Sequence, residues 1–139
     1  MEPGRQRWLG PIVLAGALYA VASIGSSALA AAAASNRELL LWRWAALAAC
    51  AVVFGSHVAY EHFRLRHRAR PAAWHVSLAV ALGAFAIALA ANLHDLSSAS
   101  GYRPRMLVAL VAWPLLTALP AYVVAWVVAA GLGMAGRRE

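Results

Sequence analysis

The sequence predicts an all-α integral membrane protein, a bundle of four transmembrane helices with short loops. Of its 139 residues, 63% are hydrophobic and only 12% are charged, whereas soluble domains average about 45–50% apolar and about 25% charged residues. The apolar residues also gather in four long runs, each able to cross a bilayer as a helix of about 20 residues. We therefore expect one transmembrane domain that covers residues 1–139.

The first two spans are predicted to cover residues 9–34 and 39–63. Pro11 lies near the start of the first run, where the first turn of a helix tolerates proline. Trp42 and Trp44 open the second run, and tryptophan favours the membrane–water interface. A basic amino terminus before an apolar run is also typical of a signal peptide. The length of the run favours a spanning helix that is retained.

The third and fourth spans are predicted to cover residues 72–96 and 106–133. Pro71 directly precedes the third span. Residues 76–91 contain a single polar side chain, Ser77, whereas a helix of a soluble protein normally shows a polar stripe. Helices also satisfy every backbone hydrogen bond within one segment, as lipid requires. Transmembrane helices are therefore the simplest interpretation.

The fourth span contains Pro114 and Pro120. Each proline removes a helical hydrogen bond, so we expect a kink between Trp113 and Ala121. Thr117 lies between the prolines and is expected to donate a hydrogen bond to a freed carbonyl. Broken helices mark binding sites in transporters. A small oligomeric transporter is therefore one alternative function.

The arginines predict the orientation of the chain in the membrane. All 12 basic residues are arginine, and the four spans divide them into eight on one side and four on the other. The first set is Arg5, Arg7, Arg64, Arg66, Arg68, Arg70, Arg137 and Arg138; the second is Arg37, Arg43, Arg103 and Arg105. The positive-inside rule then places both termini in the cytoplasm.

Composition adds an expected location and excludes one class of partner. Arginine without lysine, in a chain so rich in alanine, favours a bacterial genome of high GC content, and hence the bacterial inner membrane. The net charge of +7 does not indicate nucleic-acid binding, because the arginines lie at the ends of apolar runs. The four arginines between the second and third spans form what we call the arginine turn: Arg64, Arg66, Arg68 and Arg70. We expect this turn to contact lipid headgroups.

Two histidines flank the arginine turn. His57 lies seven residues before Arg64, or roughly 10 Å along a helix, and His75 lies five residues after Arg70, or roughly 7–8 Å. The two rings should therefore lie at similar depth on adjacent antiparallel helices. Glu61 follows His57 by one helical turn and shares its face. Ionisable groups within spans usually face the interior of the bundle.

Three functional interpretations fit these residues. In the first, His57 and His75 ligate haem b axially, with arginines near its propionates and with Gly55 and Gly83 leaving room for the ring. Alternatively, His57, Glu61 and His75 supply three ligands of the kind that bind zinc or iron. The same group is also suited to relaying protons or holding a quinone headgroup. The simplest interpretation is structural, with the side chains hydrogen-bonded to one another or to water.

The remaining polar residues are expected to face water. His62 and His67 are assigned to the solvated arginine turn. Asn92, His94 and Asp95 lie near the opposite end of the third span, where a capped helix end exposed to water is expected and a ligand site is the alternative.

The expected function is non-catalytic, because the sequence contains no catalytic motif and no soluble domain. We expect a small accessory or structural subunit that packs on a membrane-protein partner or on another copy of itself. A haem-, quinone- or metal-binding subunit that uses His57 and His75 is the alternative.

Overall fold

The computed structural model describes residues 8–97 and 105–135, which form helices and no strand. The elements are α1 (Leu9–Ala31), α2 (Asn36–Ala59), the π-helical turn η1 (Tyr60–Arg64), α3 (Ala69–Ser97) and α4 (Arg105–Ala135). Because η1 continues α2 directly, four long helices result, each long and apolar enough to cross a membrane. The predicted class, an all-α protein with four membrane-spanning helices, is confirmed.

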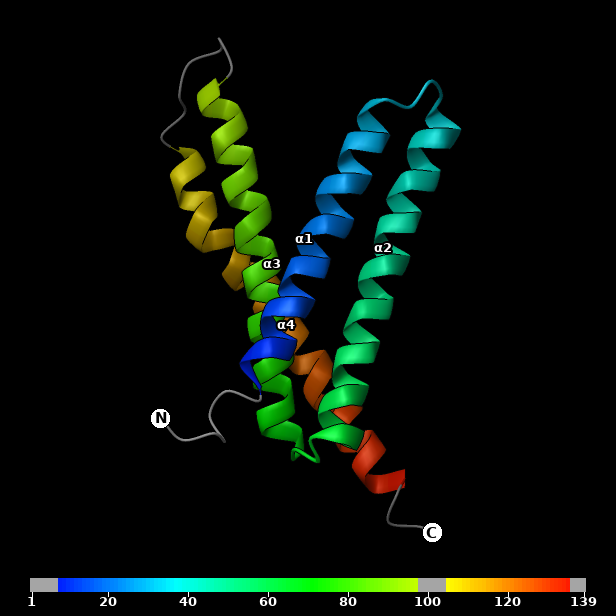
Figure 1. Cartoon of the computed structure of the whole chain (residues 1–139), viewed down its shortest axis with the longest axis vertical. Coiled ribbons are helices and arrows are strands. Elements are labelled where there is room, and N and C mark those ends of the chain that lie inside the picture. The colour runs from blue at the N-terminus through cyan, green and yellow to red at the C-terminus, as the bar shows by residue number, and fades with distance from the viewer. Residues whose placement is uncertain (1–7, 98–104, 136–139) are drawn as a thin grey trace.

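The helices are arranged as two hairpins. Figure 1 shows the α1–α2 hairpin and the α3–α4 hairpin close together at the end where η1 leads into α3, and spread apart toward the opposite end. α1 packs against both α2 and α3, and α3 forms its largest interface with α4. α2 touches α3 and α4 only slightly. The two hairpins are therefore joined mainly through α1 and α3.

A glycine allows α1 and α3 to approach closely. A β-carbon added to Gly83 would lie 2.6 Å from Cβ of Tyr19 and 3.0 Å from the carbonyl oxygen of Gly16. Small residues at such crossings are typical of membrane helices, whose association depends on close van der Waals contact. Gly83 therefore serves the packing of α1 against α3, rather than leaving the open space that haem binding was expected to use.

α2 begins at Asn36, earlier than the predicted start at residue 39. The Ser35 hydroxyl accepts a hydrogen bond of 3.2 Å from the Glu38 amide, and the Glu38 carboxylate accepts one of 3.0 Å from the Ala34 amide. This reciprocal arrangement resembles a capping box, which satisfies amides that a helix start leaves without partners. Residues 36–38, which lie between the two predicted spans, therefore form the first turn of α2. α1 ends at Ala31, three residues earlier than predicted.

α4 is one continuous helix that includes Pro114 and Pro120. The Thr117 hydroxyl donates to the carbonyl of Trp113 at 3.0 Å and to that of Pro114 at 3.1 Å. Neither is the carbonyl four residues before a proline, so the expected contact with a freed carbonyl is wrong. Thr117 instead bonds back to its own helix, as threonine commonly does. The kink between Trp113 and Ala121 stays a prediction.

Asn92 is buried, which corrects the expectation that it faces water. Only 4% of its surface is exposed. Its side-chain amide donates to the Ala88 carbonyl at 2.8 Å and to the Met106 carbonyl at 2.9 Å. Because the first turn of α4 covers this part of α3, Asn92 links the two helices. His94, by contrast, is exposed, as expected.

Candidate metal centre

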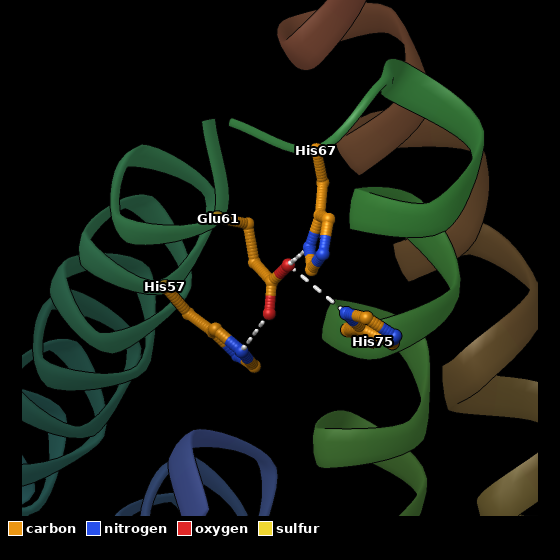
Figure 2. Close-up of polar contacts among 4 residues, drawn as sticks. All are labelled: His57, Glu61, His67 and His75. Carbon is orange, nitrogen blue, oxygen red and sulfur yellow. Dashed lines mark hydrogen bonds and ion pairs between the residues drawn. The ribbon is translucent and has the colours of Figure 1, made fainter. Parts of the chain in front are cut away.

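Glu61 is the centre of a polar cluster near the end of α2. Its side chain is fully buried, and its two carboxylate oxygens contact different histidines. Oε2 lies 2.5 Å from Nδ1 of His67 and 2.9 Å from Nδ1 of His75. Oε1 lies 3.6 Å from Nε2 of His57. Figure 2 shows the carboxylate between His57 on one side and His67 and His75 on the other.

The local backbone explains why Glu61 and His67 meet. In η1 the Leu65 amide donates to the Tyr60 carbonyl at 3.2 Å, a π-helical bond that spans five residues, and the His67 amide donates to the Glu61 carbonyl at 3.1 Å. Arg66 then adopts a left-handed conformation with φ 53°, which is uncommon for any residue other than glycine. The chain therefore folds back over η1, and His67 approaches Glu61. Single π-helical turns occur often at functional sites.

Aromatic rings fix the position of His75. The ring of Trp8, which directly precedes α1, stacks on His75 with centroids 5.1 Å apart and planes 4° apart. His67 meets His75 edge to face at 5.0 Å. These two ring contacts and the hydrogen bond to Glu61 hold the imidazole in place. Residues of α3, of the turn before it and of the segment before α1 therefore all define the site.

A buried carboxylate needs a compensating charge, because moving an unpaired charge out of water is costly. In the part of the chain that the structure describes, the ion pairs recorded for Glu61 are all with histidines: His57, His67 and His75. A bound cation would balance an ionised Glu61.

The donor set suits a transition metal. Glu61, His67 and His75 each offer one ligand atom, and these three atoms lie within 4.8 Å of one another. Carboxylate oxygen and imidazole nitrogen are common ligands of zinc, and two histidines with one carboxylate also bind non-haem iron. The cluster can therefore hold one such ion.

The structure brings the three sequence-predicted residues His57, Glu61 and His75 together and adds His67. His67 lies in the turn, as assigned, and about a third of its side chain is exposed, but it also contacts Glu61 because the turn folds back. The sequence gives no signal for this contact. Helical spacing predicts where a side chain points only as far as the α-helix continues, and His67 lies beyond the end of α2. His62 does not contact the carboxylate; its ring packs edge to face on Phe63 at 4.9 Å.

The position of Glu61 bears on the haem alternative, which stays a prediction. Axial ligation by two histidines requires the flat ring system to lie between their imidazoles. The Glu61 carboxylate occupies that space between His57 and His75 (Figure 2).

The arginine turn lies beside the cluster and faces outward. All four of its side chains are exposed, an arrangement compatible with the lipid contact expected from the sequence.

Comparison of the chain with protein-family models, with curated proteins and with solved structures finds no match. The fold and the site by themselves therefore define the class: a four-helix membrane protein with a buried carboxylate that three histidines contact.

Proposed function

We propose that this protein binds one divalent transition-metal ion, such as Zn²⁺ or Fe²⁺, through Glu61, His67 and His75. The single observation that carries the proposal is the set of three ligand atoms within 4.8 Å around a carboxylate that is fully buried. A bound cation would balance the charge of Glu61 and satisfy the imidazoles together.

The distances in the cluster require only a small adjustment. Tetrahedral zinc with bonds of about 2.0–2.1 Å separates neighbouring ligand atoms by about 3.3 Å. The two Nδ1 atoms lie 2.5 and 2.9 Å from Oε2 of Glu61, which are hydrogen-bond lengths. To admit an ion, the imidazoles of His67 and His75 each have to move away from Oε2 of Glu61 by less than about 1 Å.

The ligand types select against calcium and magnesium. Those cations prefer six or more oxygen ligands, or retain several waters. The cluster offers imidazole nitrogen from His67 and His75, which zinc and iron accept readily. The preferred ion in this proposal is therefore a transition metal.

In this proposal the metal site belongs to a small, non-catalytic accessory subunit of the bacterial inner membrane. The site lies near the cytoplasmic face, which the arginine count assigns to both termini and to the arginine turn. The partner is another membrane protein or a second copy of the chain. The long exposed surfaces of α2 and α4 support this partner. The most apolar stretch of 18 residues in each of these helices contains no buried residue, so both helices present long faces to lipid or to a partner.

The test is metal binding by the full chain purified in detergent. We expect wild-type protein to bind one Zn²⁺ or Co²⁺ per chain, measured by elemental analysis and by equilibrium titration. Glu61→Gln keeps the shape of the side chain but removes its charge, and should lower the affinity by at least about 100-fold, because loss of a direct ligand exceeds the 10- to 100-fold effect of its supporting contacts. His67→Gln and His75→Gln should weaken binding similarly.

His62→Gln and His94→Gln are the matched controls, because each removes an imidazole that does not contact Glu61. Both variants should bind metal like the wild type. Wild-type protein without stoichiometric metal, or a Glu61→Gln variant with unchanged affinity, would overturn the proposal.

A further inference from the structure

An apolar groove lies between α1 and α2, which run side by side as one hairpin (Figure 1). Its volume is about 750 Å³, within the range typical of small-molecule sites in proteins. Residues of α1 between Gly10 and Leu18 form one wall, and residues of α2 between Val52 and Tyr60 form the other. Leu14 and Val52 are more than half exposed, so the groove opens outward, which in a membrane is toward lipid.

The α2 wall of the groove leads to a positive charge. Val52, Ser56 and Tyr60 line the groove, and their spacing of four residues places them on one face of the helix. The next residue in this series is Arg64, about one turn beyond Tyr60 at the end of η1. Its side chain is exposed and belongs to the arginine turn. The groove, whose α2 wall is about 12 Å long, therefore ends near a cation.

These features match one class of molecule, an anionic phospholipid. Its acyl chains are narrow and apolar, as the groove is, and its phosphate carries the negative charge that Arg64 attracts. Arginines near the ends of transmembrane helices extend to the membrane interface, and basic pockets between such helices bind anionic lipid headgroups. We propose that the groove holds one anionic phospholipid, with an acyl chain between α1 and α2 and its phosphate against Arg64.

Other occupants fit less well. A partner helix is about 10–12 Å across with its side chains, whereas α1 and α2 pack directly against each other and leave only a groove between them. A zwitterionic phospholipid has the same acyl chains but no net charge, so Arg64 favours the anionic lipid over it by about fivefold. The proposal is also separate from metal binding, because the apolar walls and Arg64 supply no metal ligand.

The test measures lipid binding by the full chain purified in detergent. Wild-type protein is titrated with phosphatidylglycerol or with phosphatidylcholine of the same acyl chains, and native mass spectrometry counts the bound molecules and compares their affinities. We expect one phosphatidylglycerol to bind at least about fivefold more tightly than phosphatidylcholine. Equal affinity for the two lipids would show unspecific surrounding lipid only and would overturn the proposal.

Two pairs of variants locate the site. Arg64→Gln should lower the affinity for phosphatidylglycerol about fivefold and leave that for phosphatidylcholine unchanged. Arg37→Gln removes an arginine from the opposite end of α2 and should change neither affinity. Gly10→Phe fills the groove and should abolish the preferred binding, whereas Gly25→Phe adds the same ring elsewhere on α1 and should retain it; an added β-carbon meets nothing within 4 Å at either glycine. Equal effects within either pair would overturn the proposal.

A photoreactive lipid tests the wild type directly, so this measurement does not depend on the folding of any variant. Phosphatidylglycerol with a diazirine in its acyl chain should label peptides of α1 and α2 that contain the groove walls. Unlabelled phosphatidylglycerol should suppress this labelling more strongly than phosphatidylcholine does. Labelling confined to α3 or α4 would overturn the proposal.

Discussion

Nδ1 of His75 in α3 lies 2.9 Å from Oε2 of Glu61 in η1, the turn that continues α2. The contact joins two helices that otherwise touch only slightly. It lies beside the exposed arginine turn, yet Glu61 itself is fully buried. We therefore expect the polar cluster to stabilise the end of the bundle where the two hairpins meet, whether or not a metal is bound.

Removing the central carboxylate should destabilise the protein even without metal. Glu61→Ala leaves the imidazoles of His67 and His75 without their acceptor, and leaving a hydrogen-bonding group inside a protein without its partner costs about 1–3 kcal/mol. We expect a loss of that size in the free energy of unfolding, measured by detergent-induced unfolding in mixed micelles with a chelator present. The exposed control His94→Ala should change it by less than about 0.5 kcal/mol. A Glu61→Ala variant as stable as this control would contradict the prediction.

Gly83 should tolerate no larger side chain. Its added β-carbon would lie 2.6 Å from Cβ of Tyr19 and 3.0 Å from the Gly16 carbonyl oxygen, so Gly83→Ala forces α1 away from α3. Overpacking of this kind costs about 1–3 kcal/mol, measurable as a lower unfolding midpoint in detergent. Gly55→Ala is the matched control, because nothing lies within 4 Å of its added β-carbon. Equal stability of the two variants would argue against the close α1–α3 crossing.

Asn92 should stabilise the contact between α3 and α4. Replacement by leucine removes the bond of 2.9 Å to the Met106 carbonyl. Hydrogen bonds between membrane helices contribute about 0.6 kcal/mol on average and up to about 1.7 kcal/mol, and we expect a loss in that range. Ser97→Ala is the comparison, since among the described residues the Ser97 hydroxyl donates within its own helix, to the His94 carbonyl at 2.8 Å. Unfolding in detergent, monitored by tryptophan fluorescence, measures the stability of both variants. A larger loss of stability in Ser97→Ala than in Asn92→Leu would contradict the role of Asn92 in linking α3 to α4.

The arginine turn should fix the orientation of the chain. Replacing Arg64, Arg66, Arg68 and Arg70 by glutamine leaves equal numbers of arginines on the two sides. Without an arginine excess the positive-inside rule gives no preference, so mixed or inverted insertion is expected. Reporters active only in the periplasm or only in the cytoplasm, fused after Glu139, measure the proportions. The wild-type fusion should report a cytoplasmic carboxyl terminus, and a single unchanged orientation in the variant would show that other residues dominate.

The sequence by itself determined the class of the protein and most of its helices. Four apolar runs of spanning length have few alternatives, because lipid leaves a backbone no partner outside its own segment. Helical spacing also placed Glu61 on the face of His57 and brought His75 to the same depth. These inferences needed only regular geometry and chain length.

Only the tertiary structure decided what the polar residues contact. His67 joins Glu61 because the π-helical turn and the left-handed Arg66 fold the chain back, a local departure from regular geometry that no periodic pattern encodes. Asn92 is buried because α4 covers it, and Gly83 matters because Tyr19 of α1 lies against it. Helical periodicity gives the direction of a side chain on its own helix. Which residue of a neighbouring helix that side chain contacts depends on how the helices pack. The packing in turn depends on the contacts among all four helices together.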